Sequence, residues 1–280
     1  MLLSRIARQL REHDWTAVII EIAIVVVGVF IGLQVSNWND DRKDSVRGDE
    51  YLRRLHDELV LDAGQLREIS AFWSQVHDYG AAALAYAEDG QLHEGSAWRT
   101  LLAYYQSSQV WPYRKPDVTF QEIRSSGHLA LIRNQALRAR IATHYGAGAG
   151  SQVVEVLGLI PKYRESVRGM TPWHVQQYIW SHCYEANDAR QTLKDCASPV
   201  SEAQATAVIE GYRRSPELTA ELRFWMVNIN NGLTLMEGIR PEAEDFGDIA
   251  AQARTKVAGA GAHEEGVDAR GLQAIQLAGL

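Results

Sequence analysis

The sequence predicts an all-α protein in which an N-terminal transmembrane helix continues into a helical-bundle domain. The stretch AVIIEIAIVVVGVFIGLQV at 17–35 is apolar and has the length of a membrane-spanning helix, for which about 20 residues are needed. Farther along, apolar residues recur at spacings of three, four and seven, which is the period of a helix. No segment shows the sustained alternation of apolar and polar residues that is typical of a strand.

The apolar stretch is interpreted as an uncleaved signal anchor over residues 15–38. Trp15 and Trp38 flank it, and tryptophan prefers the interface between lipid and water. The apolar run is too long for a cleaved signal peptide, and no cleavage site of the small-x-small kind follows it. Residues 1–14 are then a short cytosolic N-terminal segment.

One face of the anchor carries residues that favour helix packing. Glu21, Val25, Gly28 and Gly32 fall within about 60° of one another around the helix axis. A GxxxG pair lets another helix approach closely, and a charge inside an apolar run is costly unless it is paired. We therefore expect a homodimer or a membrane-protein partner on this face. The alternative is that Glu21 reaches the lipid headgroups and the glycines reflect their general frequency in membrane helices.

The two cysteines indicate the orientation, on which Lys and Arg around the anchor give little bias. Cys183 and Cys196 flank the polar segment YEANDARQTLKD, and a bridge between them would close a short surface loop. Such a bridge persists only in an oxidising compartment, which favours a cytosolic N-terminus and an external domain. The alternative is a pair of free buried thiols.

Residues 39–257 are predicted to form the helical bundle domain, followed by a flexible tail at 258–280. The first helix covers 39–88, and Asp62 takes one position of its apolar stripe. That stripe consists of Leu52, Leu55, Leu59, Leu66, Ile69, Trp73 and Val76. Further helices are expected at 96–110, 118–127, 135–145, 151–180, 202–214 and 216–240. The long members of the bundle are 51–88, 151–180 and 216–240, and Pro161 and Pro172 imply a kink or breaks within 151–180. Their predicted caps are Ser96, Asp117, Asn134 and Ser201.

The sequence carries no motif of a known catalytic, metal or nucleotide site. None of the nine histidines has a Glu three residues before it, and HExxH and GxSxG are absent. The glycines of GAGAG at 146–150 follow a predicted helix and precede no Lys-Ser/Thr pair, so they are interpreted as a helix connection. We expect no catalytic residues, no metal and no cofactor. The net charge of −7 argues against a nucleic-acid partner.

A basic segment is the strongest candidate for a ligand site. It contains Arg114, Lys115, Arg124 and Arg133, next to Trp111 and Tyr113. Such a segment suits an anionic small ligand, a lipid headgroup or an acidic partner. The alternative is a solvated basic face that nearby acidic helices neutralise.

Two stretches together resemble a known family. They are VVVGVFIGLQVSNWN at 25–39 and TFQEIRSSGHLALIRNQALRARIATHY at 119–145, and they resemble uncharacterised bacterial membrane proteins that join an N-terminal anchor to a helical domain of unknown function. The resemblance spans about 11–145, and the ending His144-Tyr145 departs from the family's Tyr-Tyr. It implies a single domain and no activity, so no functional residue carries over.

Together these features predict a single-pass protein of the bacterial inner (cytoplasmic) membrane with a periplasmic C-terminal domain. The first hypothesis is a non-enzymatic protein whose external helical domain mediates protein interaction or assembly. The second is a sensor-like domain that binds an anionic small ligand or lipid headgroup at the basic segment. The third is an enzyme of unrecognised type.

Overall fold

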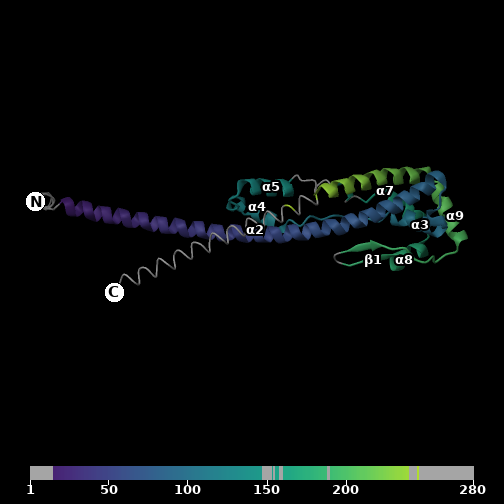
Figure 1. The fold of residues 1–280 in the computed structure, drawn as a ribbon, viewed down its shortest axis with the longest axis horizontal. Coiled ribbons are helices and arrows are strands. Elements are labelled where there is room, and N and C mark those ends of the chain that lie inside the picture. The colour runs from purple at the N-terminus through teal and green to yellow at the C-terminus, as the bar shows by residue number, and fades with distance from the viewer. Residues whose placement is uncertain are drawn as a thin grey trace, which may run out of the picture. The chain divides into compact units, whose positions relative to one another are not determined.

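The computed structural model describes residues 15–146, 153, 155–157, 160–187, 190–239 and 245, with side chains from residue 19 onward. This part of the chain is mostly helical, as the sequence predicts (Figure 1). The predicted cytosolic segment 1–14, the glycines after Gly146 and the predicted tail 258–280 lie outside the described residues. The chain divides into two compact units, Met1–Glu50 and Tyr51–Leu280, and each is described by itself.

The first helix, α2 (Trp15–Asp89), is 75 residues long and joins the predicted anchor to the predicted helix at 39–88. Its sequence contains no proline, and Gly90 ends it in a left-handed conformation with φ 73°. The Gly90 amide donates to the Tyr86 carbonyl at 2.9 Å, which satisfies one of the last carbonyls of the helix.

Within the second unit, the predicted apolar stripe of α2 is confirmed. All seven predicted side chains of the stripe, from Leu52 to Val76, are buried. Asp62, which interrupts the stripe, is buried as well and is only 1% exposed. The burial of a carboxylate among apolar neighbours requires polar partners, and these are described with the candidate sites below.

The buried apolar residues on this face of α2 belong to two hydrophobic clusters. The smaller cluster combines residues 51–59 of α2 with α4 (Val118–Ser125) and α5 (Gln135–Gly146). The larger cluster begins at Ala63 and continues to Tyr86. It adds α3 (Ala97–Gln106), α7 (Lys162–Met170), α8 (Trp173–His182), α9 (Glu202–Arg213) and the last helix at residues 216–239.

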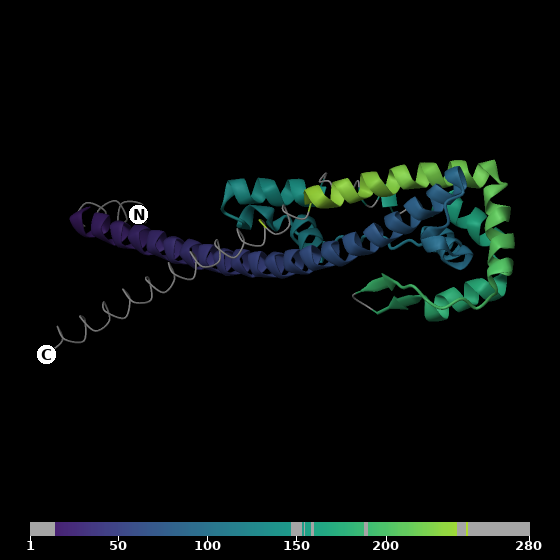
Figure 2. The ribbon, with the colours of Figure 1, turned by 45° about the vertical axis from the view of Figure 1, so that its right-hand side comes forward.

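The last helix runs antiparallel to α2. Trp225 contacts Trp73 edge to face with ring centroids 5.6 Å apart. Toward the end of α2, Arg223 Nε donates to Glu88 Oε1 at 2.7 Å. Figures 1 and 2 show the two helices side by side, with α9 turning the chain between α8 and the last helix.

Three of the four predicted helix caps are confirmed. Ser96 accepts from the Arg99 amide, Asn134 accepts from the Leu137 amide, and Ser201 forms a capping box. The prediction for Asp117 is wrong, because its side chain makes no cap bond to α4. Glu58 of α2 takes that role, since its Oε1 accepts from the Thr119 amide at 2.8 Å and from the Thr119 hydroxyl at 2.6 Å.

The helical pattern predicted over 151–180 is divided into separate helices at Pro161 and Pro172, where these prolines predict a kink or breaks. Residues 153 and 155–157 are helical, and α7 and α8 follow as separate helices. Pro161 and Pro172 occupy the positions just before α7 and α8, respectively. Because proline removes a backbone donor and clashes with the preceding turn, each proline starts a new helix.

A two-stranded antiparallel hairpin is the feature that the sequence reasoning missed. It pairs β1 (Tyr184–Ala186) with β2 (Gln191–Leu193), within the segment expected to be a loop. Three residues are too few to display an alternating pattern. The side-chain amide of Gln75 on α2 extends the pairing, since it accepts from the Leu193 amide at 3.1 Å and donates to the Leu193 carbonyl at 3.3 Å.

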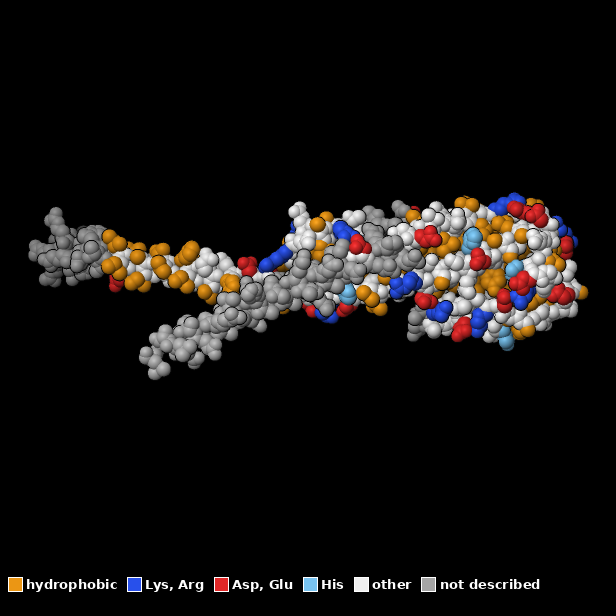
Figure 3. All heavy atoms as spheres, in the orientation of Figure 1, with side chains coloured by type: hydrophobic (Ala, Val, Ile, Leu, Met, Phe, Trp, Pro, Cys, Tyr) orange, Lys and Arg blue, Asp and Glu red, His pale blue; other side chains and the backbone are white. Residues whose placement is uncertain are grey.

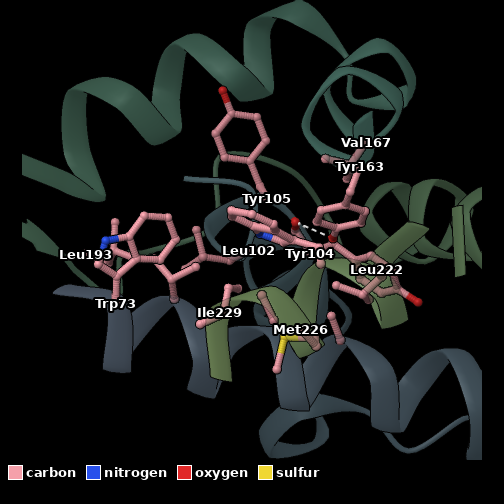
Figure 4. Close-up of a cluster of buried hydrophobic side chains, with 14 of the residues drawn as sticks. Trp73, Leu102, Tyr104, Tyr105, Tyr163, Val167, Leu193, Leu222, Met226 and Ile229 are labelled. Carbon is pink, nitrogen blue, oxygen red and sulfur yellow. Dashed lines mark hydrogen bonds between the residues drawn. The ribbon is translucent and has the colours of Figure 1, made fainter. Parts of the chain in front are cut away.

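The larger cluster is built from aromatic side chains whose polar ends reach backbone carbonyls. Trp73 Nε1 donates to the Trp111 carbonyl, and Trp225 Nε1 donates to the Ser107 carbonyl. Tyr163 donates to the Tyr104 carbonyl at 2.8 Å, deep in the cluster (Figure 4). The irregular segment after α3 is therefore held by two indole donors, one from α2 and one from the last helix.

We expect that Gly232→Ala destabilises the protein. A Cβ at Gly232 would collide with the side chain of buried Leu157, so the free energy of unfolding should fall by about 1–3 kcal/mol. Gly238→Ala on the same helix is the matched control, because its Cβ would meet no atom within 4 Å. Denaturant unfolding of both variants checks this, and equal effects would contradict the described packing.

Candidate functional sites

The anchor face predicted from the sequence is exposed along its whole length. Glu21, Val25, Gly28 and Gly32 are all exposed on α2. A Cβ at either glycine would meet no atom within 4 Å. The apolar window of this helix has none of its residues buried, and Figure 3 shows its hydrophobic side chains uncovered. By length and composition this helix qualifies as a membrane span, a test that a signal sequence also passes.

The predicted basic segment divides into exposed and inward-facing cations. Arg114, Arg124 and Arg133 are exposed. Lys115 is half-buried and its ammonium donates to the His144 carbonyl at 2.6 Å, 5.7 Å from the centre of the Tyr145 ring. Lys115 therefore belongs to a buried group of residues rather than to a surface patch, and ligand binding by the three arginines stays a prediction.

The two cysteines form a disulfide, with Cα atoms 5.2 Å apart. The bridge closes the base of the β1–β2 hairpin. Backbone carbonyls of both cysteines accept buried side-chain donors: Gln106 donates to Cys183 at 2.8 Å and Trp98 donates to Cys196 at 2.9 Å. The bridge thus attaches the hairpin to α3 and supports a domain in an oxidising compartment.

A buried polar centre, made of Asp62, Tyr113, Lys115 and His144, lies where the two hydrophobic clusters meet along α2. The Tyr113 hydroxyl donates to Asp62 Oδ1 at 2.6 Å, and both side chains are 1% exposed. His144 Nε2 lies 3.8 Å from Asp62 Oδ2, which is an electrostatic contact and too long for a direct hydrogen bond. Among the described residues, Asp62 Oδ2 has no hydrogen-bond partner.

Burial decides the protonation states in this centre. Burial raises the pKa of the Asp62 carboxyl, while the Tyr113 hydrogen bond and the Lys115 ammonium act in the opposite direction. Burial, and to a lesser degree Lys115, lowers the pKa of the His144 imidazole to about 4. His144 is therefore neutral at pH 7. Burial and the nearby Asp62 raise the pKa of Tyr113, so its hydroxyl stays protonated and remains a donor.

The centre ties three separate segments together. Asp62 comes from α2, His144 from α5, and Tyr113 and Lys115 from the connection between α3 and α4. The gap in the apolar stripe of α2 was the sequence signal for Asp62. No comparable signal marked Tyr113 or His144, because their roles depend on contacts between residues far apart in the chain.

The described residues offer no group of three or more His, Cys, Asp or Glu side chains that would hold a metal ion. No protein-family model, no curated protein and no solved structure matches this chain. The resemblance to uncharacterised bacterial membrane proteins therefore stays a prediction, and the function has to be argued from the residues themselves.

We expect that His144 makes the folded state less stable in acid. Below pH 6.5 the unfolded chain binds a proton that folded His144 excludes until about pH 4, so the free energy of unfolding should fall by about 3 kcal/mol across this window. Urea unfolding at several pH values checks this. In the His144→Gln variant, the slope of the free energy of unfolding against pH should correspond to up to one proton fewer.

The control is Asp62→Asn, because Asp62 acts with the opposite sign. Its raised pKa means that protonation in acid favours the folded state, which offsets part of the loss from His144. In the Asp62→Asn background, the fall in the free energy of unfolding that His144 causes in acid should therefore be easier to measure. If the free energy of unfolding has the same slope against pH in the unmodified protein and in the His144→Gln variant, the imidazole does not titrate differently in the folded and unfolded states.

Proposed function

We propose that this chain is a single-pass protein of the bacterial inner membrane whose periplasmic helical domain takes part in protein assembly and has no enzymatic activity. The N-terminal segment lies in the cytosol, α2 crosses the bilayer, and assembly depends on a second helix packed against the anchor. The second helix belongs to another copy of the chain or to a different membrane protein.

The observation that carries this proposal is the exposed position of Glu21 on the face that also carries Gly28 and Gly32. A carboxylate within an apolar span is costly when it faces lipid, so it favours a polar partner. The two glycines leave room for the backbone of that partner to come close. One helix packed on this face meets both requirements.

The disulfide supports the compartment. Cys183 and Cys196 are joined, and a bridge of this kind persists outside the reducing cytosol. Because the bridge lies in the part of the chain that follows the anchor, it supports a cytosolic N-terminus and an external domain. A partner of the helical domain is then a periplasmic protein.

We expect that replacing both glycines, Gly28→Leu and Gly32→Leu, reduces crosslinking of the chain to itself or to a membrane partner by tenfold or more. The bulky side chains would keep the partner backbone at a distance, and a factor of ten corresponds to about 1.4 kcal/mol of association free energy. The measurement is crosslinking in native membranes, followed by identification of the captured protein.

The matched control is Ala23→Leu with Phe30→Leu, which changes side chains on the opposite face of the same helix. This control should crosslink as the unmodified protein does. If the glycine variant assembles as well as the control, packing on the proposed face is wrong.

A further inference from the structure

Two arginines on α7 share one face and one set of partners. Arg164 and Arg168 are one helical turn apart, and both are half-buried. Arg164 Nη1 donates to the Ser108 carbonyl at 2.5 Å and to Gln109 Oε1 at 3.3 Å. Arg168 donates from Nε to Ser108 Oγ at 3.2 Å and from Nη2 to Gln109 Oε1 at 2.8 Å.

These partners are all neutral. Within the described part of the chain, both guanidiniums donate to Ser108 and Gln109 and neither is paired with a carboxylate. Other arginines differ in this respect: Arg99, for example, pairs with Asp195 at 2.7 Å. Among the described residues, these two half-buried cations contact neutral partners and repel each other, which is unfavourable. Each guanidinium also has more N–H donors than these hydrogen bonds use.

Aromatic rings line the same site. The Arg168 guanidinium lies 4.7 Å from the centre of the Tyr105 ring and 5.4 Å from the centre of the Trp180 ring. Trp180 in turn contacts Tyr184 edge to face, with ring centroids 4.7 Å apart. Rings stacked on a guanidinium hold it in place without neutralising its charge. The site therefore combines fixed cations with flat apolar walls.

The residues that accept from the two guanidiniums are buried and hydrogen-bonded to the rest of the fold. Ser108 and Gln109 are buried, and Ser108 Oγ donates to the Tyr105 carbonyl at 2.6 Å. Gln109 donates to Gln106, whose own amide donates to the carbonyl of disulfide-bonded Cys183. The guanidiniums are thus held by a turn that is anchored on α3 and on the disulfide. A ligand would meet donors that are already oriented, which lowers the entropic cost of binding.

The electrostatics agree with this geometry. Burial, and secondarily repulsion from Arg168, lowers the pKa of Arg164 to about 10, and burial lowers the pKa of Arg168. Both side chains remain charged at neutral pH. An anion would relieve the repulsion between them and replace part of the hydration that burial removes.

We propose that Arg164 and Arg168 form a binding site for a small oxyanion, a carboxylate or a phosphate, whose oxygens accept from both guanidiniums. Carboxylate and phosphate oxygens match the planar fork of arginine donors. The apolar part of such a ligand would lie against Tyr105 and Trp180. This site differs from the exposed Arg114, Arg124 and Arg133, and it does not depend on the assembly proposed for the anchor.

The test uses the full chain in nanodiscs of phosphatidylcholine, with its disulfide intact. Acetate, benzoate and inorganic phosphate are added at constant ionic strength against chloride, and the melting temperature is recorded. At a hundredfold excess over its Kd, a ligand of this site should raise Tm by about 5–10 °C. Benzoate should bind more tightly than acetate, because its ring adds contact with the aromatic walls.

Matched variants locate the effect. Arg164→Gln and Arg168→Gln should abolish the Tm shift, whereas Arg114→Gln and Arg124→Gln should leave it unchanged. Arg164→Lys and Arg168→Lys guard against misfolding of the glutamine variants, because lysine keeps the charge and a donor. Since lysine lacks the two-pronged donor geometry, calorimetric titration of the lysine variants should show at least tenfold weaker binding.

A second arm separates a soluble anion from a lipid headgroup. Nanodiscs of phosphatidylglycerol without added anion should leave Tm as in phosphatidylcholine if the ligand is soluble, and should raise it in an Arg164- and Arg168-dependent way if the ligand is a headgroup phosphate. The proposal is overturned if no oxyanion and no anionic lipid shifts Tm, or if the shifts persist unchanged in the Arg164→Gln and Arg168→Gln variants.

Discussion

Both hydrophobic clusters of the helical domain pack on the same face of α2, and this shared face is the constraint on which the packing of the other helices depends. Residues 51–59 pack against α4 and α5, and residues 63–86 pack in the cluster that contains α3, α9 and the last helix. Because these residues share one helix, the spacing between the two clusters is fixed by the helical rise. The polar residue between them, Asp62, therefore has a fixed position relative to both.

One irregular segment, from Ser107 to Lys115, connects two polar groups of the domain, the arginine pair on α7 and the polar centre around Asp62. Its first residues support Arg164 and Arg168, and its last residues bond to Asp62 and to the His144 carbonyl. Ser107, Ser108, Gln109 and Tyr113 of this segment are buried, so their backbone and side-chain polar groups need internal partners. Trp73 and Trp225 supply indole donors to the Trp111 and Ser107 carbonyls, and the Tyr163 hydroxyl lies 3.0 Å from Ser107 Oγ.

The helices and most caps were predictable because their signals are local. The apolar stripe of α2, Gly90, Ser96 and Asn134 act within a few residues of their own position. Local signals failed where a distant residue took over a role, as Glu58 does at the start of α4. The hairpin was too short to show a period, and Leu193 of β2 is bonded by the side chain of Gln75, 118 residues away. Arg164 and Arg168 carry no motif, since what distinguishes them is that, among the described residues, they donate to neutral partners.

The central claim is that α2 crosses the membrane once and that the disulfide-bonded helical domain lies outside the cytosol. Protease treatment of intact spheroplasts tests it most directly, with one epitope at the N-terminus and another after residue 280. We expect that the chain resists carbonate extraction, that the C-terminal epitope is digested, and that the N-terminal epitope is protected. Release by carbonate, or protection of the C-terminal epitope, would contradict it.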